Sequence, residues 1–198
     1  MNKQNQQKLS SDSSRRKFLT RSATGVALAS LPAKSVWATG VTGSMVASGH
    51  GSDMAGGKRL VVKWPSYWVK NISFVDKSTL NSKFSTVFGG KPFKSATKKF
   101  DGNLTVKQVL IGEASKSGVY GGPKNVNRLM ISAYLSAMYS DSATFSVHFP
   151  VVGPKRAFKT QQMFGQKLYA MAIANPSVMG TELQELHKDP VALAARLR

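Results

Sequence analysis

Cysteine is absent from this 198-residue chain, and only three histidines are present. Without cysteine there is no disulfide, no thiolate metal ligand, no iron–sulfur cluster and no cysteine nucleophile. His50, His148 and His187 lie far apart and lack the spacing of a metal site. Neither a Gly-rich nucleotide loop nor a nucleophile signature is found. The sequence therefore predicts no catalytic residue, no metal and no cofactor.

Acidic residues are scarce. The chain has 28 Lys and Arg residues against nine Asp and Glu residues, so its net charge is +19. The first 38 residues carry seven of the basic and one of the acidic residues, which leaves +13 on residues 39–198. Solubility needs only about 2 to 8 charges on a small domain. The excess favours an anionic partner, such as nucleic acid, lipid head groups, lipopolysaccharide phosphates or acidic polysaccharide; solubility alone is the alternative.

A long hydrophobic run is also missing near the N-terminus. The apolar segment 22–31 is far shorter than the roughly 20 residues that a membrane-spanning helix needs. It follows a basic motif and precedes a small-residue site ending at Ala38, which is the order of regions in a cleaved export signal. The motif consists of Ser14, Arg15, Arg16, Phe18 and Leu19.

This motif resembles the twin-arginine export signal of bacteria, whose pattern is Ser/Thr-Arg-Arg-x-Phe-Leu-Lys. Thr20 stands where the family has lysine, and Arg21 restores a positive charge one residue later. The resemblance implies export by the twin-arginine translocase, cleavage after Ala38, no stable membrane span after cleavage, and a periplasmic or extracellular location. A basic tail ahead of an ordinary Ala-rich helix is the alternative interpretation.

Residues 39–57 are rich in glycine and small polar residues, which predicts a flexible Gly/Ser linker because they offer little to bury. Residues 58–198 are predicted to form one mainly helical domain of five or six helices with a minor two-stranded β element. Period-two alternation over residues 145–151 predicts a strand with Pro150 at a sheet edge, paired with residues 59–62. His148 is expected on its exposed, polar side.

Helical spacing and caps place the helices. Residues 80–88 follow a cap at Asp76 or Ser78, and Thr105 begins a capping box. Pro123 opens the strongest apolar stripe, which we expect at the centre of the core, with Asn127, Arg128, Ser132 and Ser136 facing away from it. Further helices are expected over residues 157–174 and from Thr181 onward.

Aromatic residues gather at Trp64, Tyr67 and Trp68, with Asn71 close behind. This stretch is similar to a motif of exported bacterial proteins, in which a Tyr-Trp-Lys-Asn-His core opens a short helical domain with no agreed activity. Here Val69 is inserted and the histidine is replaced. The large apolar side chains favour a corner of the core capped by Asn71. A platform that stacks sugars or bases is the alternative.

Residues 91–100 combine lysines with Phe93 and Phe100 and contain no acidic residue. Aromatic residues interleaved with lysines are typical of grooves that bind single-stranded nucleic acid or other polyanions. A solvated loop pinned by the two phenylalanines explains the same residues. The candidate anion contacts are Lys91, Lys94, Lys98 and Lys99.

These patterns together predict an exported, non-catalytic envelope or secreted binding or structural protein whose basic surface contacts an anionic polymer or envelope component. The alternative is a small hydrolase acting on cell-wall or extracellular polysaccharide. Convergence of Asp101, Glu113 or Asp141 in one pocket would favour the hydrolase. A flat basic face would favour binding.

Overall fold

The structure is a computed structural model of the chain, and it describes residues 58–94, 103–112 and 120–190. All of these residues belong to one compact unit, Ser35–Arg198. The predicted export signal and linker lie outside the described residues. So do Lys98, Lys99, Asp101 and Glu113.

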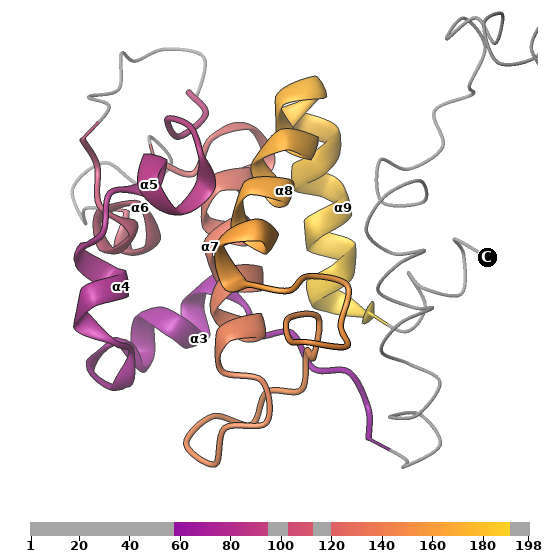
Figure 1. Ribbon diagram of the computed structural model, residues 1–198. Helices are drawn as coiled ribbons and strands as arrows, with labels where there is room; N and C mark the ends of the chain where they lie inside the picture. Colours follow the sequence, from indigo (N-terminus) through magenta and orange to yellow (C-terminus); the bar gives the residue numbers. More distant parts are fainter. Residues whose placement is uncertain (1–57, 95–102, 113–119, 191–198) are drawn as a thin grey trace, which may run out of the picture. The chain divides into compact units, whose positions relative to one another are not determined.

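The described residues form seven α-helices and two short 3-10 helices, which confirms a mainly helical fold (Figure 1). No helix in these ranges is long and apolar enough to cross a membrane. In chain order the elements are α3 (Pro65–Lys70), η1 (Ile72–Phe74), α4 (Lys77–Asn81), α5 (Phe84–Phe88), α6 (Val106–Ile111), η2 (Pro123–Asn125), α7 (Val126–Met138), α8 (Gln161–Ala174) and α9 (Pro176–Lys188).

Side-chain caps determine where several helices begin. Asp76 accepts a hydrogen bond of 2.8 Å from a first-turn amide of α4. Thr105 and Gln108 form the predicted capping box of α6, because each side chain accepts from the other residue's backbone N–H. Thr160 caps α8 through its hydroxyl oxygen, which accepts from Met163 N at 3.2 Å. These bonds satisfy amides that the first turn of a helix leaves unpaired.

The helix predicted over residues 80–88 is divided between α4 and α5. The backbone between them turns toward the start of α6, where Phe84 N donates to Leu104 O at 2.8 Å and Val106 N donates to Ser82 O at 2.9 Å. A continuous helix would use these backbone groups internally. The hydrogen bonds to residues 104–106 therefore take the place of the helical hydrogen bonds that would join α4 to α5.

The last described helix, α9, begins at Pro176 and not near Thr181. Asn175 Oδ1 accepts from Val178 N at 3.1 Å. Asn175 is therefore the residue that caps the helix, in place of the predicted cap at Thr181. Pro176 fits the first helical position, where no N–H is needed. Thr181 lies inside the helix, where its hydroxyl donates to Ser177 O.

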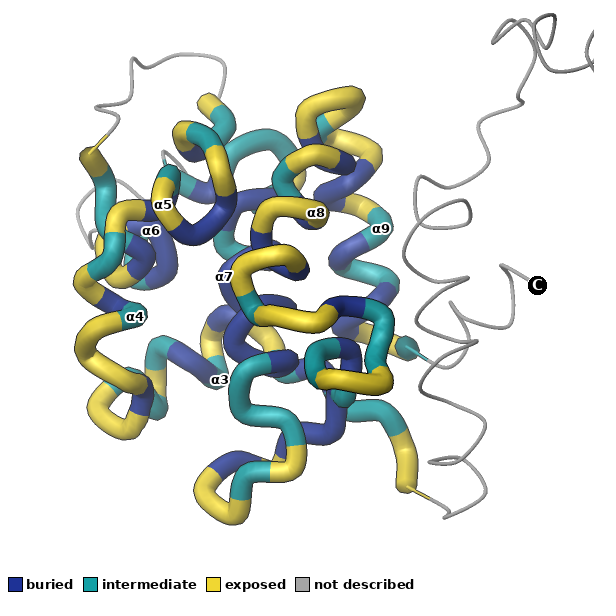
Figure 2. The backbone as a smooth tube through the Cα atoms, viewed as in Figure 1, coloured by how far each residue is buried: buried dark blue, intermediate teal, exposed yellow. Residues whose placement is uncertain are grey.

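Helix α7 occupies the centre, with α3 and α6 against one side and α8 and α9 against the others (Figure 1). Eleven of its 13 residues are buried, and it appears dark blue along nearly its whole length in Figure 2. Its predicted central place is confirmed. The predicted outward polar face is wrong, because Asn127, Ser132 and Ser136 are fully buried and Arg128 is half-buried.

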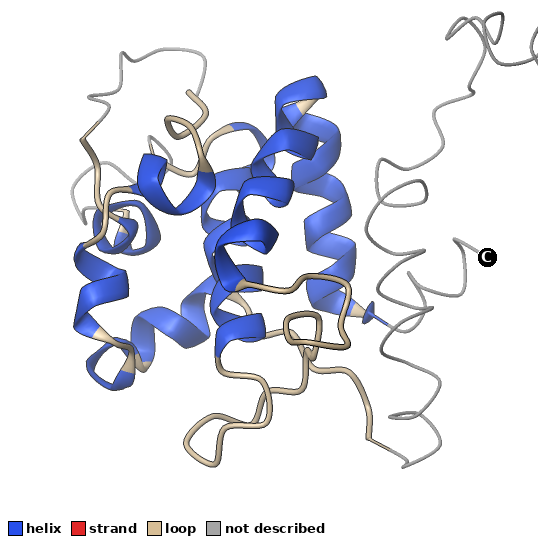
Figure 3. Ribbon diagram, viewed as in Figure 1, coloured by secondary structure: helices blue, strands red, loops and turns tan. Residues whose placement is uncertain are grey.

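No strand forms in the described residues, which contradicts the predicted two-stranded element (Figure 3). The two expected partners do meet, but only at an isolated antiparallel bridge between Val61 and His148. Val147 N donates to Phe145 O, and Val151 N donates to Phe149 O. These two amides therefore do not pair with a neighbouring strand. His148 is buried, not exposed as expected.

Candidate anion-binding surface

Positive charge is concentrated in one part of the helical unit. The described residues contain 16 Lys and Arg residues and five acidic residues. Nine of the basic residues, but only the acidic residue Asp76, fall in the described residues of the range 58–112. Six of the nine, together with Asp76, belong to the part from Pro65 onward that builds α3–α6, to the left of α7 in Figure 1, whereas Lys58, Arg59 and Lys63 precede α3. Among the described helical parts of the chain, the α3–α6 part is thus the one with the fewest acids for its basic residues.

Residues 91–94, which begin the predicted basic loop, are attached to the core through their apolar members. Pro92 is buried, and the ring of Phe93 stacks on Tyr169 with 4.9 Å between ring centroids. The Tyr169 hydroxyl donates to Lys91 O at 2.7 Å. Lys91 and Lys94 are exposed on either side of Phe93. The backbone is therefore held while both ammonium groups face water.

Asn127 of α7 provides the second attachment of this segment. Its side-chain oxygen accepts from Phe93 N, and its side-chain nitrogen donates to Phe93 O and Tyr120 O, each at 2.9 Å. Because Asn127 is fully buried, all three bonds are shielded from competing water. Each would be costly to leave unmade.

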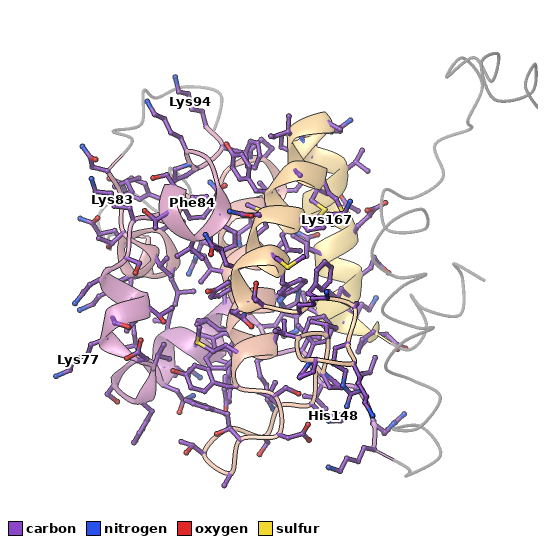
Figure 4. The ribbon with its side chains drawn as sticks, in the orientation of Figure 1. Lys77, Lys83, Phe84, Lys94, His148 and Lys167 are labelled. Carbon is purple, nitrogen blue, oxygen red and sulfur yellow. The ribbon has the colours of Figure 1, made fainter. Side chains whose placement is uncertain are left out.

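Two further exposed lysines join this side of the molecule, and no sequence motif marks them. Lys83 forms an isolated bridge with Thr105, and Lys107 follows two residues later in the first turn of α6. Figure 4 shows Lys83 and Lys94 directed outward on the same side. We call the group formed by Lys83, Lys91, Lys94 and Lys107 the lysine edge. Lys91 and Lys94 belong to the predicted basic loop, whereas Lys83 and Lys107 stand apart from it, and only the shortage of acids across residues 58–112 could have indicated those two.

The aromatic motif is split between core and surface. Trp68 is fully buried among Tyr67, Tyr139 and Phe145, and its indole N–H has no hydrogen-bond partner. Asn71 ends α3 by donating from its side chain to Tyr67 O at 2.9 Å. Trp64, in contrast, is 42% exposed. The motif therefore places Trp68 in the core and leaves the ring of Trp64 partly exposed.

Trp64 packs against His187 of α9, with 5.3 Å between the ring centroids. His187 Nδ1 donates to Leu183 O at 2.6 Å, which leaves Nε2 buried without a partner. Burial lowers the pKa of His187 to about 4, and the hydrogen bond to Leu183 offsets this only in part. The imidazole is therefore neutral at pH 7.

Asp141 is the one member of the possible acidic cluster that the structure describes. His148 Nδ1 donates to Asp141 Oδ1 at 2.9 Å, and Lys58 Nζ lies 3.3 Å from the same oxygen. Burial raises the pKa of Asp141, but His148 and Lys58 outweigh that effect and hold it below its usual value. His148 Nε2 is buried without a partner. Asp141, His148 and Lys58 together join the segment before α3 to the turn after α7.

The comparisons with known proteins add no relative. No protein-family model matches the chain, and neither the curated proteins nor the solved structures contain a match. Among the residues with described positions, no three His, Cys, Asp or Glu side chains are grouped so as to hold a metal ion. What the geometry offers is a fixed backbone that carries exposed ammonium groups.

The neutral, buried His187 predicts acid sensitivity. Its pKa is about 4 in the folded protein against 6.5 as the ordinary value, so between these values the unfolded state binds a proton that the folded state does not. Acidification from pH 6.5 to 4 should therefore lower the free energy of unfolding by up to about 3 kcal/mol. Urea unfolding across this pH range measures the loss.

His187→Gln is the matched variant, since it keeps a polar side chain but does not titrate. Its free energy of unfolding should depend less steeply on pH between 6.5 and 4. Asp76 does not interfere with this comparison. Hydrogen bonds from Ser78 and Thr79 lower its pKa to about 2, so the stability that it contributes is lost in the range below pH 4. Equal slopes for the variant and the wild type would show that His187 is not the group responsible.

Proposed function

We propose that this chain is an exported, non-catalytic binding or structural protein of the bacterial envelope or exterior, and that its lysine edge contacts an anionic partner. The observation that carries the proposal is the ratio of six basic residues to one acidic residue in the described part of the chain that builds α3–α6. An excess of positive charge of this kind attracts polyanions and adds nothing to the stability of the fold.

The attachment of the lysine edge supports a binding role. Phe93 and Asn127 hold residues 91–94 against α7 and α8, while the bridge at Thr105 fixes Lys83 beside the start of α6. Positions that are already ordered lose less conformational entropy when a partner binds. Lys98 and Lys99 extend the same segment in the sequence and complete the proposed contact set.

Export by the twin-arginine translocase is the second part of the proposal, and it rests on the sequence motif at Arg15 and Arg16. Lysine lacks the planar fork of donors that arginine offers, so it replaces a recognised guanidinium pair poorly. Changing both arginines to lysine should leave the precursor in the cytoplasm on cell fractionation. Replacing Lys3 and Lys8 with arginine is the control, because it changes basic residues outside the motif. Normal export of the double lysine variant would contradict this route.

Binding at the lysine edge predicts a specific salt dependence. Each phosphate contact releases counterions, so the logarithm of the affinity for duplex DNA falls with the logarithm of salt concentration by about 0.9 per contact. Changing Lys83, Lys91, Lys94 and Lys107 to serine should flatten this slope by roughly three to four units. Titrations of the full chain against duplex DNA, heparin and anionic vesicles at several salt concentrations measure it.

A second variant, in which Lys155, Lys159, Lys167 and Lys188 are changed to serine, removes the same charge from exposed positions outside the lysine edge. Its slope should stay close to that of the wild type. Equal flattening in both variants would mean that only net charge matters. Absence of binding to all three ligands at low salt would end the proposal and leave solubility as the explanation of the charge.

A further inference from the structure

The turn between α3 and α4 exposes an aromatic side chain. Phe74 is 65% exposed, although it lies between Ile72, which packs against the core, and the buried Val75. Figure 2 shows this turn as largely exposed at an edge of the helical unit. A phenyl ring gains free energy when it leaves water. Its outward position is therefore a feature to be explained.

The backbone of this turn is fixed, so the exposure of Phe74 does not come from a loose loop. Phe74 N donates to Asn71 O at 3.1 Å, and Val75 N donates to Ile72 O at 3.2 Å, which forms the single turn η1. Directly after it, Asp76 N donates to the Tyr139 hydroxyl at 2.7 Å. Core contacts on both sides thus hold the ring of Phe74 toward solvent.

Two lysines flank Phe74 in the sequence. Lys70 ends α3 and Lys77 begins α4; both are exposed, and neither forms an ion pair within the described part of the chain. Asp76 is the acidic group in the turn. Its carboxylate is engaged by the Ser78 hydroxyl and the Thr79 amide at the start of α4. The turn therefore carries an exposed apolar side chain with an exposed lysine before it and another after it in the chain.

We propose that residues 70–77 form a membrane-surface anchor, in which Phe74 enters the interface of an anionic lipid bilayer while Lys70 and Lys77 contact lipid phosphates. This deepens the proposed function and rests on it, since it names the lipid surface as the anionic partner. A lone apolar tip between lysines matches the layered polarity of a bilayer surface, where apolar side chains reach the acyl boundary and cations stay at the head groups.

Nucleic acid fits this turn less well. Grooves for single strands use several aromatic rings on which successive bases stack. Phe74 is the one strongly exposed aromatic ring of its turn, because Tyr67 is half-buried and Trp68 is fully buried. Stacking by Phe74 on a base is kept as an outcome of the test.

The test uses the full chain with sedimented vesicles of phosphatidylcholine and phosphatidylglycerol at a ratio of 7 to 3, and with pure phosphatidylcholine vesicles. Phe74→Ala should weaken partition onto the anionic vesicles about tenfold, the loss expected when most of a phenyl ring no longer leaves water. Lys70→Ser with Lys77→Ser should weaken it by a similar factor. All variants share the same N-terminal residues, so differences between them report on the turn.

Ile173→Ala is the matched control, because Ile173 is 61% exposed on α8. Its partition should equal that of the wild type. Phe74→Trp should bind the anionic vesicles as tightly as the wild type does. Lipids brominated in the acyl chain should quench the fluorescence of the tryptophan introduced at position 74. The same lipids should not quench the added fluorescence of Ile173→Trp.

The outcomes separate this proposal from the general one. If Phe74→Ala binds anionic vesicles as tightly as the wild type, the anchor is wrong, while salt-dependent binding through the lysine edge can still stand. If Phe74→Ala weakens binding to single-stranded DNA but not to vesicles, base stacking replaces lipid insertion. If the wild type binds neither vesicles, heparin nor DNA, both proposals fail.

Discussion

The burial of α7 on all sides is the constraint on which the rest of the fold depends. A helix with no solvent face has no place for an unpaired polar side chain, because such a group costs about 1–3 kcal/mol when buried. Asn127, Ser132 and Ser136 meet this condition by bonding to backbone outside the helix or within it. They thereby fix segments that have little regular structure of their own.

These fixed segments determine how the charge is displayed. Asn127 holds Phe93, and the hydroxyls of Ser132 and Ser136 bond the carbonyl and the amide of Lys63. The chain can therefore place lysines on exposed backbone without ordering that backbone through the lysines themselves. Packing and buried hydrogen bonds maintain the shape, and the ammonium groups are left exposed. A division of this kind allows the surface charge to be large without requiring ion pairs for stability.

Local patterns predicted much of this fold, and long-range contacts account for what they missed. The capping box at Thr105 and the central place of α7 follow from residues close in sequence. The break between α4 and α5 depends on pairing with residues 104–106, and His148 is held by its bridge to Val61 and its hydrogen bond to Asp141. Lys83, Lys107 and the Phe74 turn escaped prediction for the same reason. Their exposure is set by tertiary packing and not by sequence spacing.

The most direct test of the role of α7 is the stability and amide exchange of an Asn127→Leu variant, with Asn81→Leu, at an exposed position, as the control. Leucine has nearly the same volume but would leave Phe93 N, Phe93 O and Tyr120 O without their partner. The account predicts a loss of about 3 kcal/mol in the free energy of unfolding and faster hydrogen exchange at the Phe93 amide, with little change in the control. Unchanged stability and unchanged exchange at Phe93 would contradict it.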